Sequence, residues 1–237
     1  MTAGPAARGT SLLEGPNGVI ELITTGSGLP ATVFAHGVTG SIQTTRPFGS
    51  GVMGSRTFFH FRGFGASAPA AKPLTYPTLE ADLRGVADHV GATQALGVSM
   101  GAGALCSLLA STPLRFERLV FALPAALDRP RTDKALDGLE LAAAAPLSDR
   151  AVLRAVTAPA LVIAQEQDSE HPVWVAEQLA ASLPDAHLVV LAPGGILLRH
   201  RAAMRELIGG FLNEKRPRRL HEAVDTAQYE RANRSGV

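Results

Sequence analysis

The feature that most constrains the fold is a regular alternation of short apolar runs with helix-forming segments, which extends from residue 31 to residue 212. Short apolar runs bounded by turn residues predict strands, and apolar residues at helical spacing predict helices. Strands that alternate with helices favour a mostly parallel sheet with helices on both faces, which is an α/β architecture. The predicted strands are residues 19–24, 31–35, 56–61, 93–97, 118–123, 160–164 and 187–191, and the predicted helices are residues 78–90, 101–110, 173–182 and 197–212.

Length and composition suit one globular domain. The chain has 237 residues, is 46% apolar and carries a formal net charge of +1, so no strong field attracts nucleic acid or an anionic membrane. We expect a flexible N-terminus at 1–12, an α/β domain at 13–213 with a reduced lid at 124–159, and a polar C-terminal tail at 214–237. The sequence shows no secretory signal and no membrane-spanning run, and its single cysteine, Cys106, has no partner for an internal disulfide. These features predict a cytoplasmic protein.

A serine flanked by glycines stands between a predicted strand and a predicted helix. Gly97-Val98-Ser99-Met100-Gly101 has the pattern G-x-S-x-G, and the helix after it begins with small residues. In a nucleophile elbow the serine lies on a sharp, strained strand-to-helix turn, and the glycines leave room for that turn. The helix N-terminus also directs its N–H groups at the reacting centre. The pattern therefore predicts Ser99 as a nucleophile at the mouth of a pocket.

From these residues the chain resembles the α/β-hydrolase superfamily, over roughly residues 18–212. His36-Gly37 follows an apolar strand as the family's oxyanion loop does. The segment Arg62–Ser67 is similar to the R-G-x-G-x-S turn after the family's fourth strand, although His60 takes the place of the usual aspartate before it. The resemblance implies that the backbone N–H groups of Val38 and Met100 bind the substrate oxyanion.

The same resemblance implies an acid but no base at the usual position. Asp168, which follows the strand at 160–164, matches the triad acid, and Asp128 is the alternative. The family pattern places the general-base histidine after the last strand, where this chain has Ile196. Isoleucine cannot accept the Ser99 proton, and a serine without a base is a poor nucleophile. An atypical or degenerate triad is therefore expected.

Three histidines are candidates for the missing base. We take His200 first, because on a continuous helix it would lie one turn beyond Ile196 on the same face, about 6 Å away. His60 ends a strand at the edge where α/β sheets place ligands. His171 stands just after the predicted acid and could lie at the pocket rim, although a place on a surface loop is the simpler interpretation. His36 is expected to hold the oxyanion loop by hydrogen bonds, and His36 and His60 are further pocket candidates.

These residues favour a serine hydrolase such as an esterase, or an acyl transferase, that acts on an ester, thioester or lactone through Ser99, Asp168 and His200. Two alternatives stay open: a lyase, isomerase or cyclase that uses Ser99 and His60, and a catalytically silent ligand-binding homologue. The short lid predicts a pocket open to small-molecule or carrier-bound acyl substrates. No zinc motif or dinucleotide fingerprint is present, so we expect no metal, cofactor, nucleic acid or membrane partner. The oligomeric state stays unknown.

Overall fold

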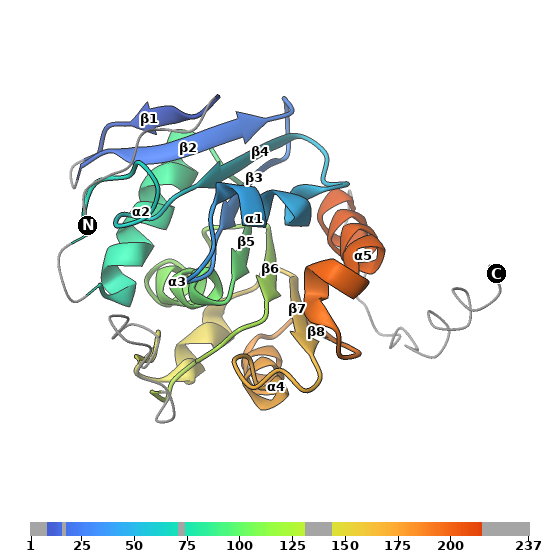
Figure 1. Ribbon diagram of the computed structural model, residues 1–237. Helices are drawn as coiled ribbons and strands as arrows, with labels where there is room; N and C mark the ends of the chain where they lie inside the picture. Colours follow the sequence, from blue (N-terminus) through green and yellow to red (C-terminus); the bar gives the residue numbers. More distant parts are fainter. Residues whose placement is uncertain (1–8, 16–17, 71–73, 131–143, 215–237) are drawn as a thin grey trace, which may run out of the picture.

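The computed structural model describes residues 9–15, 18–70, 74–130 and 144–214, which form a sheet between two layers of helices (Figure 1). The sheet has eight strands in the order β1-β2-β4-β3-β5-β6-β7-β8. β1 and β2 are antiparallel to their neighbours, and the strands from β4 to β8 are parallel, which confirms the predicted mostly parallel sheet. The strands are β1 (Ser11–Leu13), β2 (Ile20–Thr25), β3 (Ala31–Ala35), β4 (Ser55–Phe59), β5 (Gln94–Val98), β6 (Arg118–Ala122), β7 (Ala160–Gln165) and β8 (Ala186–Leu191).

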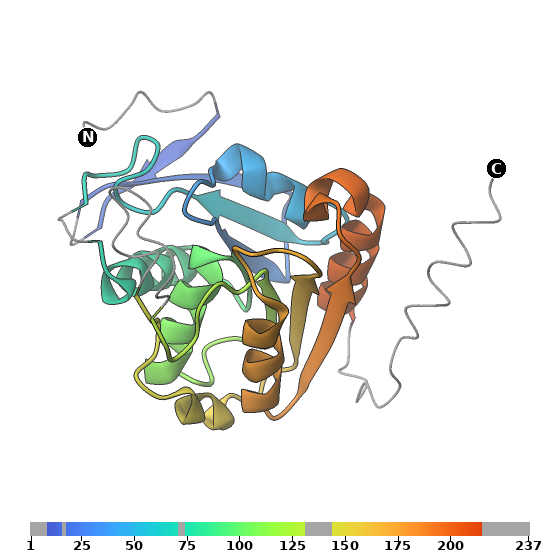
Figure 2. The same ribbon diagram turned by 60° about the horizontal axis from the view of Figure 1, so that its bottom comes forward.

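Helices cover both faces of this sheet, as Figure 2 shows. One face carries α2 (Tyr76–His89), the helix α3 (Met100–Ser111) that follows the serine, the short 3₁₀ helix η3 (Arg150–Ala155) and α4 (Val173–Ser182). The other face carries α1 (Ile42–Thr45), the 3₁₀ helix η1 (Arg46–Gly49), the π-helical turn η4 (Gly195–Arg199) and α5 (Arg201–Asn213).

The two faces of the sheet bury two separate apolar cores because side chains alternate along each strand. In β3, Val33 and Ala35 face the α2–α3 side, and Phe34 between them faces the α1–α5 side. Phe34 stacks on Phe58 of β4 with ring centroids 4.5 Å apart. Each fully buried side chain of this size contributes about 1.5–3 kcal/mol. Burial on both faces is also the reason why the central strands are nearly continuous apolar runs.

The structure differs from the sequence prediction at three places in the chain. Strand β1 (Ser11–Leu13) begins within the segment 1–12 that was expected to be flexible, because its backbone pairs with β2. Residues 42–49 form α1 and η1, which are too short to show a helical period. The helix predicted at 197–212 is instead the turn η4 followed by α5, with a break at His200. The rest of the expected N-terminal segment up to residue 8, and the expected tail from residue 215, lie outside the described residues.

The lid predicted at 124–159 is described at residues 124–130 and 144–159. Its second part turns back onto the core: the N–H of Leu147 donates to the carbonyl of Leu127 at 3.0 Å, and Leu153 and Val156 are fully buried. Within the described residues of this segment, η3 is a short 3₁₀ helix. The described parts of this segment therefore pack beside α3 and α4 and leave the sheet edge at Ser99 accessible.

Helix α3 is buried from Met100 to Leu109, and only its last two residues are exposed. Burial raises the pKa of the Cys106 thiol to about 12, so this side chain stays protonated and packs as a small apolar group. Among the helices that the structure describes, none combines the length and the apolar character needed to cross a membrane.

Candidate active site

Ser99 lies on a strained turn between β5 and α3, as the G-x-S-x-G pattern predicts. Its φ of 51° is in the left-handed region, which costs a non-glycine residue on the order of 1–3 kcal/mol. A Cβ on Gly97 would collide with the backbone of Gly101, and a Cβ on Gly101 would collide with that of Ala35. The N–H of Ser99 donates to the carbonyl of Ala122 at 2.9 Å. These contacts fix the serine at the carboxyl edge of the sheet.

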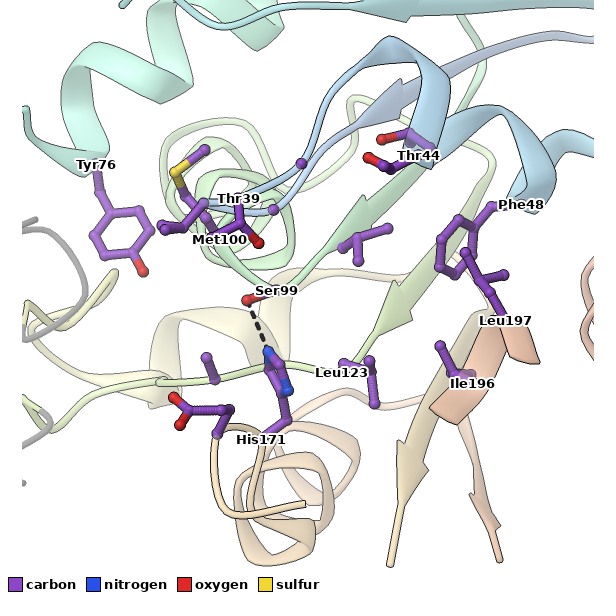
Figure 3. A pocket seen from close by; sticks show the side chains of 17 residues that line it. Thr39, Thr44, Phe48, Tyr76, Ser99, Met100, Leu123, His171, Ile196 and Leu197 are labelled. Atoms are coloured by element: carbon purple, nitrogen blue, oxygen red, sulfur yellow. Dashed lines mark hydrogen bonds between the residues drawn. The ribbon is translucent and has the colours of Figure 1, made fainter. Parts of the chain in front are cut away.

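The Ser99 hydroxyl is hydrogen-bonded to His171, as Figure 3 shows. His171 Nε2 lies 2.9 Å from Ser99 Oγ, and His171 Nδ1 lies 2.9 Å from Asp168 Oδ2. Because a carboxylate only accepts hydrogen bonds, the ring proton is on Nδ1, and Nε2 accepts from the serine. The three side chains thus have the order nucleophile, base and orienting acid.

The acid and the base both come from the short turn between β7 and α4. Asp168 Oδ1 accepts the backbone N–H of Glu170 at 2.9 Å and that of His171 at 3.2 Å, and its Oδ2 accepts from the imidazole. One carboxylate therefore both folds the turn and orients the ring. Each of the two side chains is 19% exposed, so the pair lies at the rim of the site and not deep inside it.

Backbone strain is concentrated at this edge of the sheet. Among the described non-glycine residues, Ser99, Leu123 and Gln167 have a positive φ. They follow β5, β6 and β7, which are neighbours in the sheet. Strain of this kind persists only where the surroundings enforce it, and it gathers at functional sites. The residues with positive φ therefore lie at the same edge of the sheet as the hydrogen bonds between Ser99, His171 and Asp168.

Ser99 lines a cavity of about 440 Å³ with a mostly apolar wall, which is typical of a site for a small molecule. The two residues predicted to supply oxyanion donors, Val38 and Met100, line the cavity together with the serine. Met100 is the first residue of α3, so its N–H has no acceptor within the helix. Within the described lid segment, Ala125 lines the cavity.

In the part of the chain that the structure describes, no three His, Cys, Asp or Glu side chains gather where they could hold a metal ion.

His36 and His60 lie behind the oxyanion loop and do not line the cavity, so their prediction as pocket residues is wrong. His36 donates from Nδ1 to the carbonyl of Gly37 at 2.7 Å, and its Nε2 accepts the N–H of Phe61 at 3.1 Å. His60 Nε2 accepts the N–H of Ile42 at 3.0 Å. The two rings thus hydrogen-bond to Gly37 and Ile42, at the two ends of the loop after β3, and His36 also bonds to Phe61 just after β4.

The second nitrogen of His60 is bound to a buried carboxylate. His60 Nδ1 lies 2.8 Å from Glu21 Oε2, which also accepts the N–H of Ala66 at 2.7 Å. The side chains of His60 and Glu21 are only 7% and 2% exposed. Both nitrogens of His60 are thus occupied away from Ser99. The lyase, isomerase or cyclase alternative loses the histidine on which it depended.

The buried His36 predicts an acid-sensitive fold. Burial lowers the pKa of His36 from 6.5 to about 4, so between these values the unfolded chain binds a proton that the folded chain does not. Neutral His36 makes its full contribution to the free energy of unfolding above pH 6.5. This contribution, about 3 kcal/mol, is lost as the pH falls towards 4. We expect urea unfolding to show this loss in the wild type and a flatter dependence in His36→Gln. The matched variant His200→Gln should keep the wild-type slope, and equal slopes in all three proteins would refute the assignment.

His200, the predicted base, does not reach Ser99. Its Nε2 donates to the carbonyl of Ala192 at 2.8 Å. The prediction assumed a continuous helix. In the structure η4 is a π-helical turn, and the helix is interrupted at His200, whose φ is −108°. Ile196 and His200 are therefore not stacked on one helix face. The alternative acid, Asp128, lies 3.5 Å from Arg150 Nη1 and not beside a histidine.

The sequence does not single out His171 among the three candidate histidines. The family pattern favours a base after the last strand and therefore His200, whereas a surface loop is the simpler interpretation of His171. A usable signal was present: Asp168 and His171 are three residues apart, directly after a buried strand at the ligand-binding edge. A carboxylate at that spacing can cap the turn and bind the imidazole.

No family model and no curated protein matches the sequence, whereas many solved structures resemble the fold. An esterase from Exiguobacterium antarcticum has a TM-score of 0.73 at 18% identity, over 86% of this chain and 99% of that one. An α/β-hydrolase enzyme from a Medee basin deep-sea metagenome library has a TM-score of 0.74 at 15% identity, over 88% and 99%. A bromoperoxidase from Bacillus anthracis has a TM-score of 0.70 at 18% identity, over 86% and 100%. Together with the eight-stranded sheet and the serine turn, these likenesses show that the chain has the α/β-hydrolase fold.

Proposed function

We propose that this protein is a serine esterase that hydrolyses neutral carboxylic esters through Ser99, His171 and Asp168. The observation that carries the proposal is the continuous hydrogen-bonded chain from Ser99 Oγ through both nitrogens of His171 to Asp168, at the wall of a mostly apolar cavity. This arrangement supplies the base that position 196 lacks. This triad contains a serine, a histidine and an aspartate. It is atypical because its histidine lies in the turn after β7 and not after the last strand.

The proposed reaction has two halves. Ser99 Oγ attacks the ester carbonyl carbon and forms a C–O bond, while its proton moves to His171 Nε2. The tetrahedral intermediate then breaks its bond to the alcohol oxygen, which receives that proton and leaves. A water molecule, deprotonated by His171, attacks the acyl-serine in the same way, and the carboxylic acid leaves with Ser99 restored. Asp168 stabilises the protonated imidazole in both halves.

The backbone around the serine supports stabilisation of the oxyanion. Val38 lies in the loop held by His36, and Met100 begins α3 next to Ser99. Gly37 allows this loop to approach closely, because a Cβ there would lie 3.3 Å from the Cβ of Ser99. Backbone N–H groups of this kind are typically worth about 3–4 kcal/mol in the transition state. We assign this role to the N–H groups of Val38 and Met100.

The charges of the lining favour a neutral substrate. Among the described lining residues, none is Lys or Arg, and Glu170 contributes a carboxylate beside His171. A carboxylate or phosphate on the substrate would find no lysine or arginine side chain in the described part of this wall. An uncharged ester fits this wall better than an anionic one.

The fold alone does not select this reaction, because an esterase and a bromoperoxidase share it at similar TM-scores. The side chains at the site decide. A base within hydrogen-bond distance of a strained serine supports acyl transfer from an ester to water. Thioesters and lactones would react through the same atoms, and oxoesters are the simplest substrates for a test.

Replacing Ser99 with alanine tests the proposal. We expect the wild type to hydrolyse p-nitrophenyl acetate and butyrate, and Ser99→Ala to lose about 10⁶-fold in kcat, because the nucleophile is gone. Ser111→Ala, at the other end of α3, is the matched control and should keep wild-type turnover. If an ester raises the melting temperature of the wild type but no Ser99-dependent hydrolysis is measured, the protein binds ligands without hydrolysing them and the proposal is wrong.

A further inference from the structure

Four apolar residues form one end of the cavity beside Ser99. Phe48, Leu123 and Ile196 are 4%, 9% and 8% exposed and belong to the apolar core on the α1–α5 side of the sheet, and Leu197 packs against this core. All four line the cavity. Figure 3 shows them on one side of Ser99, with Tyr76 on the other. We call the space between these four side chains the apolar arm.

The opposite end of the cavity belongs to the other core. Tyr76 and Met100 are part of the apolar core on the α2–α3 side. That end also borders the oxyanion loop through Val38, which packs against the same core. The cavity therefore extends from one side of the sheet to the other, across the carboxyl edge where Ser99 stands. Its two ends are lined by side chains of different cores, so each end can take one half of a substrate.

Ile196 occupies the position after the last strand that the family resemblance assigns to the base. Because His171 reaches Ser99 from the turn after β7, no proton has to be transferred at position 196. An imidazole there would need a polar partner for its second nitrogen. The isoleucine instead belongs to a buried apolar cluster. Placing the base at residue 171 therefore leaves position 196 available for an apolar side chain in the cavity wall.

We propose that the apolar arm binds the hydrocarbon part of the acyl group, and that Ile196 sets the acyl length that the esterase accepts. This inference rests on the proposed function. The acyl group is the half that stays covalently bound to Ser99 while the alcohol leaves, so the wholly apolar arm beside the serine suits its hydrocarbon chain. The alcohol then leaves through the remaining, more polar part of the cavity, where Glu170 and His171 lie.

The expected result is a shift in acyl-chain preference. In the wild type, each methylene that enters the arm should raise kcat/KM about fourfold until the arm is full. Ile196→Ala deepens the arm and should move the optimum in a p-nitrophenyl ester series to longer acyl chains. Ile196→Phe fills the arm and should move it to shorter ones. Ile196→Val also deepens the arm, but by less than Ile196→Ala. It therefore tests the same shift if the larger cavity of the alanine variant destabilises the fold.

A matched control and a second substrate series make the test specific. Leu198 lies in the same turn η4, is 88% exposed and does not line the cavity, so Leu198→Ala should keep the wild-type optimum. In a series of acetate esters with lengthening alcohols, the Ile196 variants should keep the wild-type profile. A shift in the alcohol series, or unchanged acyl profiles in all Ile196 variants, would overturn the assignment. Absence of any Ser99-dependent hydrolysis would instead refute the proposed function, so the two failures are distinguishable.

Discussion

Replacing His171 with alanine is expected to lower kcat/KM for ester hydrolysis by about 10⁴- to 10⁶-fold. His171 Nε2 is the group that lies 2.9 Å from the serine hydroxyl, and its loss leaves Ser99 without an acceptor for its proton. What remains is binding and the oxyanion donors, which do not depend on the imidazole. Steady-state kinetics with p-nitrophenyl butyrate measure the loss, and the melting temperature shows whether the variant is folded.

His200→Ala is the matched control for this loss. His200 was the base expected from the sequence, but its Nε2 binds the carbonyl of Ala192. We expect its replacement to leave kcat/KM within about twofold of the wild type, as for a surface substitution. A large loss in His200→Ala together with a small loss in His171→Ala would mean that the base comes from the turn after β8, and the assignment of His171 would be wrong.

Asp168→Asn is expected to lower kcat by about 10⁴-fold with little effect on folding. An asparagine can keep its oxygen in the place of Oδ1, where it accepts the N–H groups of Glu170 and His171, so the turn is preserved. Its NH₂ then faces His171 Nδ1 and donates to it. That contact forces the ring proton to Nε2, which can no longer accept from Ser99.

The corresponding control is Asp128→Asn, which replaces the acid that the sequence left as an alternative. Asp128 lies near Arg150 at 3.5 Å, so its replacement should change kcat by no more than about twofold. Equal losses in the two variants would show that both carboxylates matter to the reaction. A wild-type kcat in Asp168→Asn would remove Asp168 from the mechanism.

The sheet was predictable because its strands are buried on both faces. Residues 31–35 and 160–164 are apolar at nearly every position, and the structure places β3 and β7 there. The helix α4 was predicted with the bounds that the structure shows. Elements whose conformation depends on distant partners were missed: β1 exists through pairing with β2, and α1 begins where His60 accepts the N–H of Ile42.

The candidate site was predictable where a local pattern determines it. The glycines around Ser99 reveal the strained turn, because only residues without a Cβ fit there. Ile196 stands where the family resemblance places the base, and this absence of an imidazole can be read from the sequence directly. The position of His171 depends on a loop in which Gln167 has a φ of 57° and Asp168 caps the backbone. Periodicity does not determine such a loop, and the three-residue spacing of Asp168 and His171 is only a weak signal for it, so the sequence favours a surface position for His171.

The most direct test of the central claim is the rate at which a fluorophosphonate labels Ser99, followed by intact-mass spectrometry. In the proposed mechanism, reaction at the serine requires activation by His171, whose Nε2 lies 2.9 Å from the hydroxyl, but no particular substrate. We predict a single adduct on the wild type, none on Ser99→Ala, slowing by orders of magnitude in His171→Ala and the wild-type rate in His200→Ala. No adduct on the wild type, or labelling of His171→Ala at the wild-type rate, would contradict the account.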